Sequence, residues 1–197
     1  MMRRRLGPTI ILLALFAIAL SSVARDIDSR ASARPEGPAA ELLAQLPVEP
    51  ENRAGYERDR FGDYDRPAVL AANHADYPDC DGYYSAADAV CHLSADGVQV
   101  DHLVPLAEAW DSGAWSWGPD QLDQFAGDIQ NLWLMTSALN QAKSDADPAE
   151  WLPPAEAAVC DYVTTWIEVK AAYSLSVDQA ERAALEQALA SCPGGGA

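Results

Sequence analysis

The segment that most restricts how this chain folds is at its N-terminus. Residues 10–20 form an unbroken apolar run behind three arginines at residues 3–5, and small residues follow up to Ala24. This order is typical of a secretory signal peptide. We therefore predict a signal peptide over residues 1–24, cleaved after Ala24, and a secreted or cell-envelope protein. The alternative is an uncleaved anchor over residues 6–24, which is just long enough to cross a bilayer and would tether the protein to the membrane.

The rest of the chain contains four cysteines, an even number that fits an oxidising compartment. They form no CxxC pair, which argues against a zinc knuckle or a thioredoxin-type site. Four cysteines allow three pairings. We favour the bridges Cys80–Cys91 and Cys160–Cys192, because each would close a local unit of the chain. Each bridge would then stabilise the fold by about 2–4 kcal/mol.

The composition predicts one folded domain with a strongly acidic net charge. Of 197 residues, 49% are hydrophobic and six are tryptophan, which is enough apolar material for a core. The formal net charge is −17, and loss of the three N-terminal arginines would make it more negative. Such a chain cannot hold nucleic acid or an anionic membrane by bulk positive charge. No sequence pattern indicates a stable protein partner.

We divide the chain beyond residue 24 into three parts. Residues 25–55 are rich in alanine and proline and have the character of a linker, with a short, loosely docked helix over residues 39–46. Residues 56–192 would form the folded domain, and residues 193–197 a disordered tail. The expected fold class is α+β and mostly helical.

A two-stranded hairpin is predicted within the domain. Residues 98–100 have the pattern of a strand, and residues 131–136 that of its partner. Helices are expected around the hairpin, one from Pro67 and others over residues 106–112 and 119–129. The last of these would bury one apolar face, made of Leu122, Phe125 and Ile129.

The C-terminal third is predicted to be a helical hairpin held by the Cys160–Cys192 bridge. An aromatic stripe of this kind is more often core than cofactor site, and its residues here, at helical spacing, are Tyr162, Trp166, Val169 and Tyr173. Ser176 and Gln179 have the spacing of a capping box at the start of the second helix. The inward residues of that helix would be Leu185, Leu189 and Cys192.

A small set of polar residues indicates chemistry on phosphate. An Asp101–His102 pair comes at the end of the first predicted strand, and Asn131, Asn140 and Lys143 follow around the second. Carboxylate and amide oxygens suit Mg²⁺, and a neutral histidine can take a proton from water near neutral pH. Together these groups favour attack on a phosphodiester with a metal ion neutralising the phosphate.

Each of these residues alone also has an ordinary structural explanation. A histidine at a strand end is usually a surface or satisfied core residue, and an asparagine before a helix is usually a cap. Neighbouring strand residues also point to opposite faces. Asp101 and His102 can therefore share a site only if the strand bends or ends there, which Pro105 makes plausible. The order and spacing of the whole set favour the functional interpretation.

The order Asp-His-x-x-Pro, Asn-Leu, Asn-x-x-Lys is similar to that of the HNH (ββα-metal) endonucleases. The longer stretches VDHLVPLAEAWDSGA (residues 100–114) and DPAEWLPP (residues 147–154) resemble a group of small exported bacterial HNH proteins. That group is related to the C-terminal nuclease domain of GmrSD-type restriction enzymes. The resemblance extends over residues 56–192.

The resemblance implies a fold and a set of roles. The fold would be a ββα-metal core, with the two-stranded hairpin embedded in surrounding helices. His102 would be the general base, while Asp101 and Asn140 would hold Mg²⁺ or Mn²⁺. Asn131 would orient the loop between the strands and so position His102. Lys143 would lie near the substrate phosphate or order the metal-binding helix.

This chain departs from the family pattern in its cations. Gln141 stands where family members often have a basic residue. In the helix before the second predicted strand, family members tend to carry an arginine and an Asn-Asp pair. This chain has Gln124 and residues 127–128 at those places. Fewer cations along the phosphate path predict nucleic-acid binding that is weak, strongly metal-dependent and sensitive to salt.

The resulting hypothesis is a divalent-metal-dependent endonuclease that hydrolyses phosphodiester bonds in nucleic acid, with DNA favoured over RNA. The alternative is an exported HNH-fold protein that is catalytically weak or inactive and acts as an envelope-associated binding or structural module. Calcium binding without chemistry and a metalloprotease are both disfavoured, because the chain has neither EF-hand spacing nor an HExxH motif.

Overall fold

The computed structural model describes residues 37–192. The signal peptide or anchor expected over residues 1–24, the first part of the expected linker and the tail at residues 193–197 lie outside the described residues. Among the described helices, none is both long and apolar enough to cross a membrane. The predicted division into linker and domain stays a prediction.

The fold is α+β and mainly helical, as predicted. Its sheet content is limited to two antiparallel hairpins in the described part of the chain, β1–β2 and β3–β4. The strands are β1 (Tyr83–Ser85), β2 (Val90–His92), β3 (Gln99–His102) and β4 (Leu132–Met135). The α-helices are α2 (Pro38–Gln45), α3 (Arg66–Asp76), α4 (Leu106–Asp111), α5 (Pro119–Gly127), α6 (Ser137–Lys143), α7 (Glu156–Ala172) and α8 (Gln179–Ser191). Short 3-10 helices are η1 (Arg58–Arg60), η2 (Ala95–Gly97), η3 (Ala114–Ser116) and η4 (Ile129–Asn131).

The predicted pairing of the two central strands is confirmed. β3 and β4 are antiparallel, with Asp101 opposite Trp133 and His102 opposite Leu132. The strand β3 ends at His102, and Pro105, which has no N–H to donate to a ladder, then leads into α4. Val100 and Leu132 pack in a small core with α3, so Asp101 belongs to the other face of the hairpin.

Helix α5 differs from its prediction at the C-terminal end. Leu122 and Phe125 are buried as expected, but Ile129 is 44% exposed. The helix ends at Gly127, and Ile129 belongs to the following 3-10 helix η4, which turns it away from the apolar face. The expectation that Ile129 belongs to this buried face is therefore wrong.

The C-terminal helical hairpin is confirmed as α7 and α8. All four residues of its aromatic stripe are buried, as are the inward residues of α8. The predicted capping box was wrong, because the capping box is formed by Asp178 and Glu181. Asp178 accepts a hydrogen bond from the Glu181 N–H, whereas the Ser176 hydroxyl donates to the Ser112 carbonyl.

Both favoured disulfides are present in the structure. Cys80, which lies between α3 and β1, is bonded to Cys91 in β2, and Cys160 near the beginning of α7 is bonded to Cys192 at the end of α8. No free cysteine remains. Each bridge closes a local unit, as the spacing predicted.

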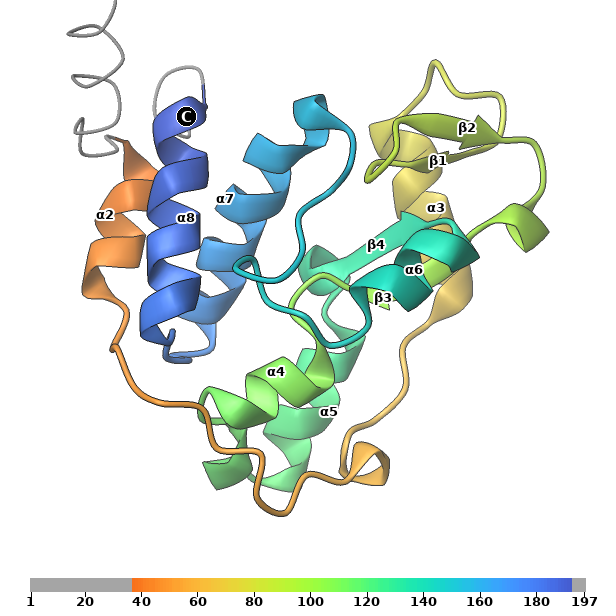
Figure 1. Cartoon of the computed structure of the whole chain (residues 1–197). Helices are drawn as coiled ribbons and strands as arrows, with labels where there is room; N and C mark the ends of the chain where they lie inside the picture. Colours follow the sequence, from red (N-terminus) through yellow and green to blue (C-terminus); the bar gives the residue numbers. More distant parts are fainter. Residues whose placement is uncertain (1–36, 193–197) are drawn as a thin grey trace, which may run out of the picture. The chain divides into compact units, whose positions relative to one another are not determined.

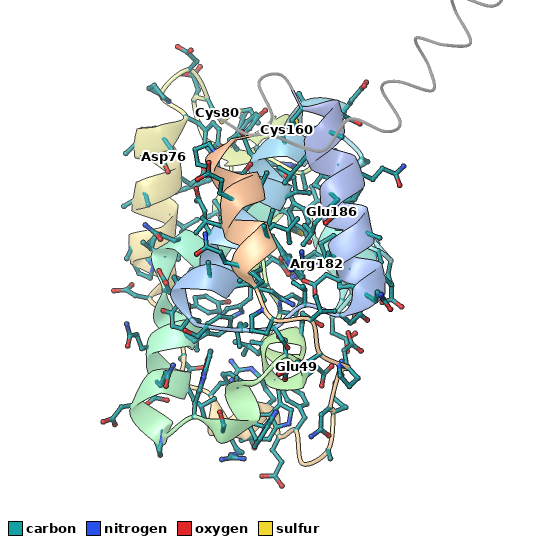
Figure 2. All side chains as sticks on the ribbon, turned by 90° about the vertical axis from the view of Figure 1, so that its left-hand side faces the viewer. Glu49, Asp76, Cys80, Cys160, Arg182 and Glu186 are labelled. Atoms are coloured by element: carbon teal, nitrogen blue, oxygen red, sulfur yellow. A yellow bond between two sulfur atoms is a disulfide. The ribbon has the colours of Figure 1, made fainter. Side chains whose placement is uncertain are left out.

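Helix α2 packs against α7 and α8 (Figure 1). Its Ala39 and Leu43 belong to the larger hydrophobic core, so the helix is not loosely docked as we expected. Figure 2 shows Arg182 on α8 beside this helix. The Arg182 guanidinium donates to the carbonyls of Leu43 and Leu46, at 2.8 Å each, and so satisfies the C-terminal end of α2.

Lys170 connects three helices through a buried charge cluster. Its Nζ on α7 donates to Glu108 Oε1 on α4 at 2.6 Å and to Glu181 Oε2 on α8 at 2.7 Å. The Glu108 and Glu181 side chains are each only 2% exposed. Burial lowers the pKa of Lys170, but the two carboxylates outweigh this effect and raise it. The cluster therefore holds α4 in place, and α4 is the helix that follows Asp101 and His102 in the chain.

Burial also raises the pKa of Glu108 to about 8, against the opposing effect of Lys170. Between the ordinary glutamate pKa and this value, the unfolded chain gives up the proton while the folded chain keeps it. The free energy of unfolding should therefore fall as the pH rises from about 5 to about 8. We predict that Glu108→Gln flattens this pH dependence of the free energy of unfolding.

Urea unfolding of the wild type and Glu108→Gln across this pH range measures the effect. Glu186→Gln is the matched control, because Glu186 is exposed on α8 and makes only a 3.8 Å contact with Arg182 (Figure 2). Identical pH dependence in the wild type and Glu108→Gln would contradict the prediction.

Candidate functional site

One pocket brings together three of the five predicted site residues. It has a volume of about 250 Å³ and is lined by residues at the end of β3, at the start of α4 and in and after α6. Asp101, His102 and Asn140 all line it. Asn131 and Lys143 are not among its lining residues, but Lys143 hydrogen-bonds the His102 carbonyl and Asn131 the backbone of Val104, two residues further along.

The His102 imidazole is fixed in one tautomer. Its Nε2 lies 2.9 Å from the Ala126 carbonyl, which can only accept, so Nε2 carries the proton and Nδ1 has a lone pair. Ala126 is in the last turn of α5, where carbonyls have no partner within the helix. The Tyr64 ring meets the imidazole edge to face, with centroids 5.8 Å apart.

Burial keeps the His102 imidazole neutral. It lowers the pKa of His102 to about 4, while the Ala126 carbonyl works in the opposite direction. The positive charges of Arg58 and Lys143 also contribute to this lowering of the His102 pKa. Near neutral pH the ring therefore has an unprotonated nitrogen.

Asp101 forms a buried ion pair with Lys143. Its Oδ2 lies 2.8 Å from Lys143 Nζ, and the two side chains are 7% and 0% exposed. Nζ also donates to the His102 carbonyl at 2.8 Å. Burial raises the pKa of Asp101 and lowers that of Lys143, and each partner offsets part of the other's shift. Of the two roles expected for Lys143, this geometry fits ordering of the site, because the ammonium is inaccessible to a substrate phosphate.

Asn131 holds the turn that follows His102. Its Oδ1 accepts from the Val104 N–H at 2.8 Å, and its Nδ2 donates to the Val104 carbonyl at 3.0 Å. The Asn131 carbonyl accepts a further bond from the Leu103 N–H at 2.8 Å. The side chain is completely buried, so it contacts the loop and not the solvent of the pocket.

Asn140 reaches the pocket from the middle of α6. Thr136 caps this helix by accepting a hydrogen bond from the Leu139 N–H. The Asn140 amide Nδ2 donates to Gln99 Oε1 at 2.9 Å, which orients the side chain and leaves its oxygen as an acceptor. The amide is therefore anchored to β3, the strand that carries Asp101.

The donors in this pocket fit a hard divalent cation. Asp101 and Asn140 offer carboxylate and amide oxygens to the same pocket. Two other groups of carboxylates could also attract a cation, one with Glu51, Asp147 and Asp178 and one with Glu51, Glu108 and Asp111. Neither includes a residue of this pocket.

One wall of the pocket is made of residues that the sequence motif does not include. Tyr56 and Arg58 line it from the segment that precedes α3, and Asp145 lines it beyond α6. Arg53 ties the two parts together through a 2.7 Å ion pair with Asp145. The signal available in the sequence was the group of arginines at residues 53–60 in an otherwise acidic chain.

Comparisons with known proteins agree with the geometry. The family described as "GmrSD restriction endonucleases, C-terminal domain" matches residues 62–188. An "Uncharacterized secreted protein" of Arthroderma benhamiae is 37% identical over 173 residues, which cover 78% of this chain and 84% of that protein. No solved structure matches significantly.

The bonds of Asn131 lead to a stability prediction. Asn131→Ala leaves the buried N–H and carbonyl of Val104 without these partners, so we expect a loss of about 2–4 kcal/mol in the free energy of unfolding. Gln130→Ala is the control, because the neighbouring Gln130 is exposed. Urea unfolding measures both, and an Asn131→Ala protein as stable as the control would contradict the role in the turn.

Proposed function

Because the chain belongs to the family of GmrSD restriction endonuclease C-terminal domains, we propose that it is a divalent-metal-dependent HNH endonuclease. It would hydrolyse phosphodiester bonds in nucleic acid, with DNA favoured over RNA. The observation that carries the proposal is the meeting of Asp101, His102 and Asn140 in one pocket at the end of β3. The β3–β4 hairpin followed by α6 would then be the ββα-metal core.

His102 is the general base of the proposed reaction. Its Nε2–H is held by the Ala126 carbonyl, so Nδ1 is the nitrogen that would take a proton from the attacking water. The lowered pKa of His102 keeps that nitrogen unprotonated near neutral pH. Asn131 supports the base by fixing the turn directly after it.

Asp101 and Asn140 would hold Mg²⁺ or Mn²⁺. A bound divalent cation supplies positive charge to the phosphate as negative charge develops there. Lys143 has a positioning role beside these ligands, because its Nζ contacts both the Asp101 carboxylate and the His102 carbonyl. It therefore sets the spacing between the proposed ligand and the proposed base.

The proposed site of action is outside the cytoplasm, in the medium or the cell envelope. Two disulfides hold the fold, and the curated relative is named as a secreted protein. The expected signal peptide would deliver the chain there, and an uncleaved segment would leave it tethered to the membrane.

A plasmid-nicking assay with Mg²⁺ or Mn²⁺ tests the proposal. We expect cleavage by the wild type that EDTA abolishes, and a loss of at least about 100-fold in His102→Ala, because the general base is gone. His74→Ala should cleave like the wild type, since His74 is exposed on α3 and does not line the pocket.

Two results would count against the proposal. Full activity of a folded His102→Ala protein would overturn the role of the histidine. No cleavage by a folded wild type with either metal would favour the alternative, an exported HNH-fold module without catalysis.

A further inference from the structure

We propose that Arg58 binds the phosphate backbone of the substrate in this pocket, an inference that rests on the proposed nuclease function. The expected ligand is a phosphodiester group of nucleic acid, recognised by charge and not by base sequence. Nothing in the sequence motif indicated this residue, because it lies well before Asp101 and His102 in the chain.

The other cations in the described part of the chain are buried, stacked on an aromatic ring or bonded to the protein itself. Lys143 and Lys170 are completely buried in ion pairs. The Arg60 guanidinium lies over the Trp110 ring, 4.5 Å from its centroid, and Arg60 does not line the pocket. The remaining arginines bond acidic groups or carbonyls of the protein itself: Arg53, Arg66 and Arg182.

Arg58 itself is placed to meet a ligand in the pocket. It lines the same pocket as His102, and its side chain is 45% exposed. Nη1 donates to the carbonyls of Phe61 at 3.1 Å and Gly62 at 3.4 Å, which orients the guanidinium from one side. The described residues provide no hydrogen bond to Nε or Nη2, so these donors can engage a ligand.

The only acidic contact of Arg58 among the described residues is weak. Nη2 lies 3.7 Å from Asp63 Oδ1, and the Asp63 side chain is fully exposed. An exposed ion pair at this distance contributes little and is screened by salt. A phosphate could therefore replace Asp63, with the planar guanidinium fork donating two parallel hydrogen bonds.

The electrostatics of the pocket agree with this placement. The positive charge of Arg58 acts on Tyr56, which lines the same pocket, and offsets part of the rise that burial causes in the pKa of Tyr56. The charged groups that face it across the pocket are Asp101 and Asp145, and each is already paired with a cation of the protein. Arg58 is thus the cation of this pocket that a phosphate can reach.

The test measures DNA binding in a cleavage-deficient His102→Ala background. A fluorescein-labelled duplex is titrated in Mg²⁺ at several salt concentrations, with and without Arg58→Gln. We expect Arg58→Gln to weaken binding about tenfold near 0.1 M salt and to make the slope of log affinity against log salt shallower by about 1. Arg58→Lys should keep most of the slope, because it keeps the charge. Arg60→Gln, from the same 3-10 helix, should match the background.

An unchanged affinity and salt slope in Arg58→Gln would overturn the inference, and so would an equal effect of Arg60→Gln. A merely structural role of Arg58 would lower the thermal midpoint without changing the salt slope. The plasmid-nicking assay tests the nuclease proposal separately, because that proposal fails if the wild type does not nick plasmid. If the wild type neither binds nor cleaves DNA, both proposals are overturned.

Discussion

The buried cluster of Lys170 with Glu108 and Glu181 is the interaction on which the arrangement of the helices depends. It joins α4 to α7 and α8 through hydrogen bonds of 2.6 and 2.7 Å. Because α4 begins a few residues after His102, the cluster also holds in place the chain segment that leads from His102 into α4. Removing Lys170 would leave the buried carboxyl groups without a compensating cation, which costs far more than a surface ion pair contributes.

A second buried lysine organises the pocket itself. Lys143 contacts the Asp101 carboxylate and the His102 carbonyl, while Asn131 holds the next turn through Val104. Both lysines of this acidic chain are thus buried inside the fold. The proposed nuclease would depend on a bound metal ion and on Arg58 for positive charge at the phosphate, which explains how a net charge of −17 can be compatible with a nucleic-acid substrate.

The sequence predicted those features that local patterns determine. Strand patterns at residues 98–100 and 131–136 identified the β3–β4 hairpin, and closure of a local unit of the chain identified both disulfides. Tertiary contacts decided the rest. The choice of Asp178 over Ser176 as the helix cap depends on a bond from Ser176 to Ser112. Lysine is rarely buried, so only the distant Asp101 explains the position of Lys143. Arg58 reaches the pocket only because the chain folds back across it.

The most direct test of the central claim is the Mg²⁺ dependence of plasmid nicking by the wild type and Asn140→Ala. Of the two proposed metal ligands, Asn140 is the better one to replace. Replacing Asp101 would also remove the ion-pair partner of buried Lys143, whereas the Asn140 side chain hydrogen-bonds only the Gln99 side chain among the described residues. If Asn140 is a metal ligand, the nicking rate of the wild type saturates with Mg²⁺. Asn140→Ala should then need at least about tenfold more Mg²⁺ to reach half of its maximal rate. Nicking that persists in EDTA, or the same Mg²⁺ dependence in both proteins, would contradict the central claim.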